Sequence, residues 1–136
     1  MVAAVARLAP RSNASTLVSM NSAAKSVFVF GLYLVVVGLG LLTVPNPFLR
    51  PLGFPLVADT SWLRVLGLVT LGLAFYYLAA ARAGLGVFCR WTVMVRGGVF
   101  VGCGALVLLK LAPAPLALFG AVDLAGALWT AVALRR

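Results

Sequence analysis

The strongest constraint on this chain is a run of apolar residues, 27–44, that contains no charged side chain. An apolar helix of roughly 18 residues or more is long enough to cross the hydrocarbon core of a membrane. Three later runs have a similar length and character, so the sequence predicts an all-α fold, a bundle of four transmembrane helices. The predicted spans are 27–44, 62–81, 92–111 and 115–134.

Composition supports this assignment. The chain has 136 residues, of which 64% are hydrophobic, and its mean hydropathy is +1.16. Soluble domains are about 45–50% apolar, and a core of this size could not bury so much apolar surface. We therefore expect one transmembrane domain, residues 27–136, preceded by a polar and basic segment, residues 1–26, that is predicted to be flexible.

The connections between the spans carry two further expectations. Four prolines, at positions 45, 47, 51 and 55, should stop any helix and produce an extended loop at the headgroup boundary. Arg96 falls in the first turn of the predicted third span, so we expect its long side chain to reach out of the membrane to the headgroups.

The basic residues indicate the orientation of the four spans. The N-terminal segment, the 82–96 connection and the C-terminus hold residues 7, 11, 25, 82, 90, 96, 135 and 136, whereas the opposite side holds residues 50, 64 and 110. Cytoplasmic segments carry the excess of lysine and arginine, which predicts cytoplasmic termini and a multi-pass protein of the bacterial inner membrane. The formal charge of +9 then points to anionic membrane lipids as partners. Nucleic acid is not expected, because no basic run is interleaved with stacking aromatic residues.

The residue inventory argues against most catalytic chemistry. The chain has no histidine and no glutamate, and its acidic residues are Asp59 and Asp123. Cys89 and Cys103 form no CxxC motif. His-ligated metals, His-based catalytic triads and paired glutamates are therefore excluded. We expect no cofactor and no enzymatic activity.

Two segments repeat weakly. Residues 37–40 match residues 101–104, and the second and fourth spans align without gaps at an offset that sets Gly67 on Gly120. This alignment predicts a tandem repeat of two helical hairpins, although apolar sequences also align by chance. It also sets Thr70 opposite Asp123, so both polar groups would face the axis of the bundle.

Asp123 is the acidic residue inside an apolar span, and it permits two interpretations. It is either a proton- or cation-binding carboxylate, or a structural group that bonds to a neighbouring helix. The expected structural partners are Lys110 or Arg64, with Thr70 as a hydrogen-bond donor. We favour the structural interpretation and keep the proton site as the alternative.

Glycines recur along the spans and predict close helix packing, because small residues let helix backbones approach one another in lipid. The positions concerned are Gly38, Gly67, Gly98, Gly102, Gly120 and Gly126. Packing within the chain is the favoured interpretation, and a dimer face is the alternative.

Three segments carry a resemblance to known proteins: residues 45–48 (PNPF), 62–67 (WLRVLG) and 119–124 (FGAVDL), the last followed by Leu128-Trp129-Thr130. With these segments the chain resembles small bacterial four-helix membrane proteins similar to the DoxX-like group. That resemblance covers most of the chain from Val27 onward. It implies a four-helix bundle and no assigned chemistry. The small multidrug resistance transporters are similar in size, but their working glutamate lies in the first span, which has no acidic residue here.

Together these observations predict a non-enzymatic integral membrane protein that acts as an accessory, scaffold or lipid-interacting subunit. Its partner would be another membrane protein or a second copy of the chain. The alternative is a proton-coupled carrier or channel for a small cationic or lipophilic solute, working through Asp123.

Overall fold

A computed structural model describes residues 20–136, and within that range the protein is entirely helical, without strands. Four helices are long and apolar enough to cross a membrane: α3 (Ser22–Thr43), α5 (Ser61–Arg82), α6 (Gly86–Leu108) and α7 (Leu116–Leu134). The prediction of an all-α bundle with four spans is confirmed. Residues 1–19, which make up most of the predicted flexible segment, lie outside the described residues.

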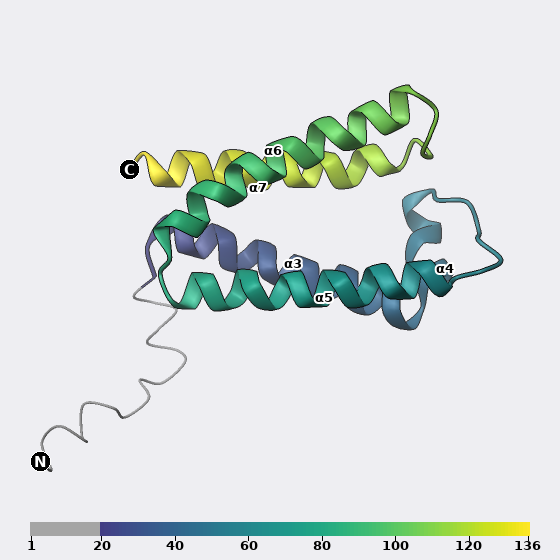
Figure 1. The fold of residues 1–136 in the computed structure, drawn as a ribbon, viewed down its shortest axis with the longest axis horizontal. Helices are drawn as coiled ribbons and strands as arrows, with labels where there is room; N and C mark the ends of the chain where they lie inside the picture. Colours follow the sequence, from purple (N-terminus) through teal and green to yellow (C-terminus); the bar gives the residue numbers. More distant parts are fainter. Residues whose placement is uncertain (1–19) are drawn as a thin grey trace, which may run out of the picture.

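The four helices form two hairpins (Figure 1). Helix α3 packs along α5, α6 packs along α7, and the hairpins meet chiefly where α3 lies against α7. The start of α3, the α5–α6 turn and the C-terminus lie at the same end of the bundle. Residues 22 and 136 therefore lie on one side of the membrane, as four antiparallel spans require.

Helix α3 begins earlier than the sequence suggested. The predicted start was Val27, with residues up to 26 assigned to the polar segment, but the helix begins at Ser22. The side chain of Asn21 accepts a hydrogen bond of 2.7 Å from the amide of Ala24, which caps the first turn. With this earlier start, Ser26 is a buried helical residue rather than part of a linker.

Helix α6 also begins earlier, at Gly86 instead of Thr92, and it ends at Leu108 instead of residue 111. At 1.5 Å per residue, Arg96 therefore lies about 15 Å from the start of its helix and about 18 Å from the end. This shift moves Arg96 from the membrane edge to the middle of the bundle.

The proline-rich connection between α3 and α5 is folded rather than extended. It contains a short helix, α4 (Pro45–Leu49), and a 3-10 turn, η2 (Arg50–Leu52). Proline is compatible with the first helical turn, where its missing N–H would have no partner. The Asn46 side chain bonds both backbone groups of Val57, at 2.9 and 3.2 Å, and closes this connection on itself.

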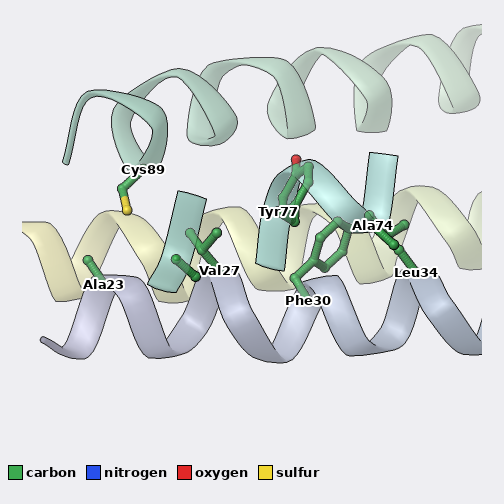
Figure 2. Close-up of a cluster of buried hydrophobic side chains, with 8 residues drawn as sticks. Ala23, Val27, Phe30, Leu34, Ala74, Tyr77 and Cys89 are labelled. Carbon is green, nitrogen blue, oxygen red and sulfur yellow. The ribbon is translucent and has the colours of Figure 1, made fainter. Parts of the chain in front are cut away.

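The centre of the core lies between α3 and α5 (Figure 2). Val27 is fully buried, and the rings of Phe30 and Tyr77 lie 5.3 Å apart between their centroids. The hydroxyl of Tyr77 points from α5 toward α6 and is hydrogen-bonded to that of Thr92. This hydrogen bond links the two hairpins at the edge of an apolar core.

Helices α3 and α5 lie close together at two of the predicted packing glycines, Gly38 and Gly67. A Cβ atom on Gly67 would lie 2.6 Å from the backbone nitrogen of Leu42 and 2.8 Å from the carbonyl oxygen of Gly38. Both of those atoms belong to the backbone of α3. A side chain at position 67 would therefore push the two helices apart, so this glycine pair lies at a close contact between helices.

Two long helices end in the same way, with a left-handed residue that lets the chain reverse. Gly84 (φ 64°) follows α5, and Lys110 (φ 59°) follows α6. In each case the next amide reaches back to the helix, from Leu85 to the oxygen of Ala80 and from Leu111 to that of Leu106. This pattern is a Schellman motif, which glycine usually occupies because it has no Cβ.

The helix bounds agree with the predicted repeat in one respect. The starts of α3 and α6, Ser22 and Gly86, are related by the same offset as Gly38 and Gly102 in the sequence alignment. The packing differs, however, because Gly38 contacts α5, whereas the space at Gly102 is open among the described residues. Duplication of a hairpin stays a prediction.

The α3–α5 approach generates a first test. We expect Gly67→Ala to destabilise the folded protein by about 1–3 kcal/mol, because the added Cβ meets backbone atoms that cannot move independently. The measurement is thermal or denaturant unfolding in detergent. Gly72→Ala in the same helix is the matched control, since the described residues leave open space around that position. Equal stability of the two variants would contradict the close approach.

The end of α6 generates a second test. Lys110→Gly should stabilise the protein by up to about 1 kcal/mol, because it removes the cost of a left-handed conformation in a residue with a Cβ. Lys110→Val should lower stability, since β-branching makes that conformation worse. Unfolding midpoints of the three proteins give the order, and a Lys110→Gly protein less stable than the parent would show that the lysine side chain stabilises this turn.

Candidate functional site: a buried arginine between the hairpins

Arg96 is the most deeply buried charged residue that the structure describes, with 1% of its surface exposed. The expectation that it reaches the headgroups was wrong. A side chain in the first turn of a helix can extend to the membrane surface, but Arg96 lies in the middle of α6 and is enclosed by the neighbouring helices. A buried guanidinium in a transmembrane segment is costly and requires a physical explanation.

Side chains of two other helices contact the guanidinium. Its central carbon lies 3.5 Å from the centre of the Phe30 ring on α3, a cation–π contact. Its Nε lies 3.8 Å from Oδ1 of Asp123 on α7, whose side chain is 17% exposed. Arg96 therefore neutralises the one carboxylate of the spans and, at the same point, contacts the other hairpin.

Gly126 makes room for this arrangement. A Cβ on Gly126 would overlap Nη2 of Arg96, so no other residue type fits against the guanidinium as it stands. The sequence predicted Gly126 to be a helix-packing glycine, and the structure shows that the group it accommodates is a charged side chain rather than a helix backbone.

The bonding of Arg96 is incomplete. Nε, Nη1 and Nη2 are all buried, and none has a hydrogen-bond acceptor among residues 20–136. The distance to Asp123 is that of an ion pair, longer than the 2.7–2.9 Å of a charge-assisted hydrogen bond. The Nη1 and Nη2 atoms therefore offer unused donors in an apolar environment.

A polar contact between α3 and α7 lies close to Arg96. The hydroxyls of Ser26 and Thr130 are 2.9 Å apart, and both residues are buried. Ser26 also lies 2.8 Å from the oxygen of Ala23, and Thr130 lies 2.9 Å from that of Gly126. Each hydroxyl has one proton, so one hydroxyl donates to the other, which donates in turn to its own helix. This contact joins the two hairpins on the side of the chain termini.

The expected partners of Asp123 lie elsewhere, so both predicted pairings were wrong. Nη1 of Arg64 donates to the carbonyl oxygens of Leu42 and Thr43, at 2.7 and 3.3 Å, and thereby satisfies the end of α3. Lys110 is exposed at the turn after α6. The partially buried Thr70 donates to the oxygen of Leu66 in its own helix, so it provides no bond to Asp123.

The other five predicted packing glycines divide into two groups. Gly38, Gly67 and Gly120 contact the other helix of their own hairpin; a Cβ on Gly120 would lie 3.0 Å from that of Cys103. At Gly98 and Gly102 on α6, no atom of the described chain lies within 4 Å of the position of an added Cβ. For these two glycines the favoured expectation, packing within the chain, is not met among residues 20–136.

The other acidic residue, Asp59, plays a local role outside the spans. Its carboxylate accepts a hydrogen bond of 2.9 Å from the amide of Ser61, the first residue of α5. Hydrogen bonding from Ser61 holds the pKa of this exposed carboxyl below its usual value. Asp59 therefore stabilises a helix start and does not contribute to the buried site.

Sequence reasoning missed Arg96, Phe30, Ser26 and Thr130 as members of this site. A signal for Arg96 was present: the segment 86–89 (GVFC) is apolar enough to extend the span toward the N-terminus. With that extension, Arg96 becomes a basic residue in mid-span, matched by an acidic residue in the next span. No comparable signal indicated Phe30, because its contact with Arg96 is tertiary.

The site contains no ligand set for a metal, since no three cysteine or acidic side chains gather anywhere in the described part of the chain. Comparisons with protein-family models, curated proteins and solved structures find no match for this chain. Its class is therefore defined by the fold: a small multi-pass membrane protein of four apolar helices.

The ion pair generates a third test. We expect Arg96→Met to lower the free energy of unfolding by about 2–3 kcal/mol, because it leaves Asp123 unpaired in an apolar environment. Asp123→Leu should also be destabilising, because it leaves the buried guanidinium of Arg96 without a counter-charge. The double variant should be more stable than the sum of the single effects predicts, by about 1–3 kcal/mol in a double-mutant cycle.

Unfolding in detergent measures this cycle. Arg64→Met serves as the control, because Arg64 bonds the end of α3 and its effect should be additive with that of Asp123→Leu. A coupling energy of zero between positions 96 and 123 would contradict a structural ion pair.

Proposed function

We propose that this protein is a non-enzymatic accessory subunit of the bacterial inner membrane, which binds another transmembrane helix along the exposed face of α6. The partner is a further membrane protein or a second copy of the chain. The resemblance to the DoxX-like group forms part of the same proposal, since it implies a four-helix bundle without a catalytic constellation.

The observation that carries the proposal is the open glycine surface of α6. Gly97, Gly98, Gly102 and Gly104 have no neighbouring atom of residues 20–136 at the position of an added Cβ. The buried residues of α6 are Cys89, Thr92 and Arg96, all in its first half. Glycine inside a helix costs up to about 1 kcal/mol relative to alanine, and close packing of a second helix is the usual compensation in membranes.

Lipid contact alone accounts for the apolar side chains of this face but not for its glycines. Met94, Val101 and Leu108 are 76%, 67% and 83% exposed, as expected of a helix surrounded by lipid tails. The glycines between them form a shallow surface into which a helix fits more closely than flexible acyl chains. This difference favours a protein partner at α6.

A second candidate, a proton-coupled carrier for a small cationic or lipophilic solute, rests on Asp123. Its side chain is 17% exposed and is held by an ion pair rather than by a hydrogen bond. The carboxylate can therefore exchange Arg96 for a proton or a cation without breaking a hydrogen bond. The two candidates differ in the response to Asp123→Asn. A carrier would lose proton-coupled uptake into liposomes at unchanged stability, whereas a structural ion pair would lose stability.

The accessory proposal predicts that the full-length protein forms an assembly larger than one chain in a mild detergent. Gly98→Leu and Gly102→Leu should shift it to a smaller mass with little change in thermal stability, since neither side chain meets an atom of the described chain. Size-exclusion chromatography with light scattering gives the mass. Gly72→Leu on α5 is the control, because its surroundings within the described residues are equally open. An assembly unaffected by both α6 substitutions would overturn the proposal.

A further inference from the structure

A cavity of about 250 Å³ lies between the two hairpins, and Arg96 forms part of its wall. The other walls come from α3, with Ser26 and Phe30, and from α7, with Gly126 and Trp129. Arg96 is 1% exposed, so its guanidinium lies at the inner wall of this cavity, and a molecule in the cavity contacts it only once the lining side chains shift. The volume is that of several water molecules or of a small polar headgroup.

A second cavity, of about 480 Å³, lies next to the first along the same helices. The two share Tyr33 of α3 and Val122 of α7, and the second extends to Phe48 in α4. Ser26 and Val37 mark the two ends on α3, about 16 Å apart at the helical rise. The arrangement is a groove with a charged donor at one end and a longer apolar section at the other.

At the end of the groove formed by Arg96, a bound molecule would need a hydrogen-bond acceptor. Among the described residues, Nη1 and Nη2 of Arg96 have no acceptor, and an unmade bond to a buried charged group costs more than one to a neutral group. A water molecule could occupy the small cavity, but it would not account for the apolar section beyond it. A molecule with an acceptor at one end and an apolar body at the other matches both cavities.

Charge balance favours a neutral acceptor. Arg96 and Asp123 already form an ion pair with no net charge, so a bound anion would leave one uncompensated negative charge in an apolar environment. Depth leads to the same conclusion, since Arg96 lies about 15 Å from the nearer end of α6. Charged lipid headgroups stay at the membrane surface, whereas uncharged carbonyl compounds partition into the interior.

We propose that the groove between α3 and α7 binds an uncharged, lipid-soluble carbonyl compound, with its carbonyl oxygen accepting hydrogen bonds from the Nη atoms of Arg96 and its apolar body lying toward α4. This site is independent of the α6 surface on which the proposed function rests. Gly126 and the ring of Phe30 hold the guanidinium at the end of the groove, and Asp123 keeps the site neutral overall.

The experiment uses benzophenone, a lipid-soluble ketone that inserts into neighbouring C–H bonds when irradiated. The full-length protein in detergent is labelled, and the modified peptides are mapped by mass spectrometry. Labelling should occur on the segments of α3 and α7 that line the two cavities. Tridecan-2-one and tridecane, which have the same number of carbons but differ in the carbonyl oxygen, are then added as competitors.

We expect the ketone to halve the labelling at a concentration about tenfold lower than the alkane does, as a hydrogen bond to a charged donor implies. In the double variant Arg96→Met with Asp123→Leu, which removes both charges, the two competitors should act equally. Ala125→Phe should abolish labelling by filling the first cavity, since Ala125 lines it. Ala117→Phe, two turns away on the same side of α7, lies outside both sets of lining residues and should leave labelling unchanged.

Several results would overturn the proposal. Equal competition by ketone and alkane in the parent protein would show that no acceptor is recognised. If Ala125→Phe leaves the labelling intact, the probe lies on the outer surface and not in the cavity. This comparison is valid even if the double variant fails to fold. Stronger competition by tridecanoate than by tridecan-2-one would show that the site takes an anion.

Discussion

The burial of Arg96 is the constraint on which the rest of this bundle depends. A guanidinium in the middle of an apolar helix needs a counter-charge, a polarisable surface and space, and each comes from a different residue: Asp123, Phe30 and Gly126. Asp123 and Gly126 lie one turn apart on α7, and Phe30 lies on the other hairpin. Accommodating this one side chain therefore brings three helices to a common point.

This requirement explains how two hairpins associate without a hydrophobic driving force between them. Lipid tails are as apolar as leucine, so helix contact in a membrane depends on close packing and polar bonds. Within the first hairpin, Gly38 and Gly67 supply the close packing. Between the hairpins, Ser26 is hydrogen-bonded to Thr130, and Tyr77 to Thr92. Arg96 adds a third contact between the hairpins, with the ring of Phe30.

The same arrangement leaves two surfaces of different character. The outer face of α6 carries glycines without a neighbour in the described structure, and it supports the proposal of a helical partner. The inner groove between α3 and α7 ends at the Nη atoms of Arg96, which have no acceptor among residues 20–136, and it supports the proposal of a lipid-soluble ligand. An accessory subunit that also binds a small membrane-soluble molecule would use both surfaces without requiring catalysis.

The sequence by itself determined the fold class and the number of spans, because predominantly apolar runs of about 18 residues or more form helices across a lipid bilayer. It also indicated that Asp123 needed a structural explanation and that Gly38 and Gly67 pack. Only the tertiary structure decided the partner of Asp123. The start of α6 at Gly86 rather than Thr92 moves Arg96 by about 9 Å along the membrane, and the apolar segment 86–89 permits this earlier start without requiring it. The contact with Phe30 and the open face at Gly98 and Gly102 depend on how two hairpins cross, which local sequence does not encode.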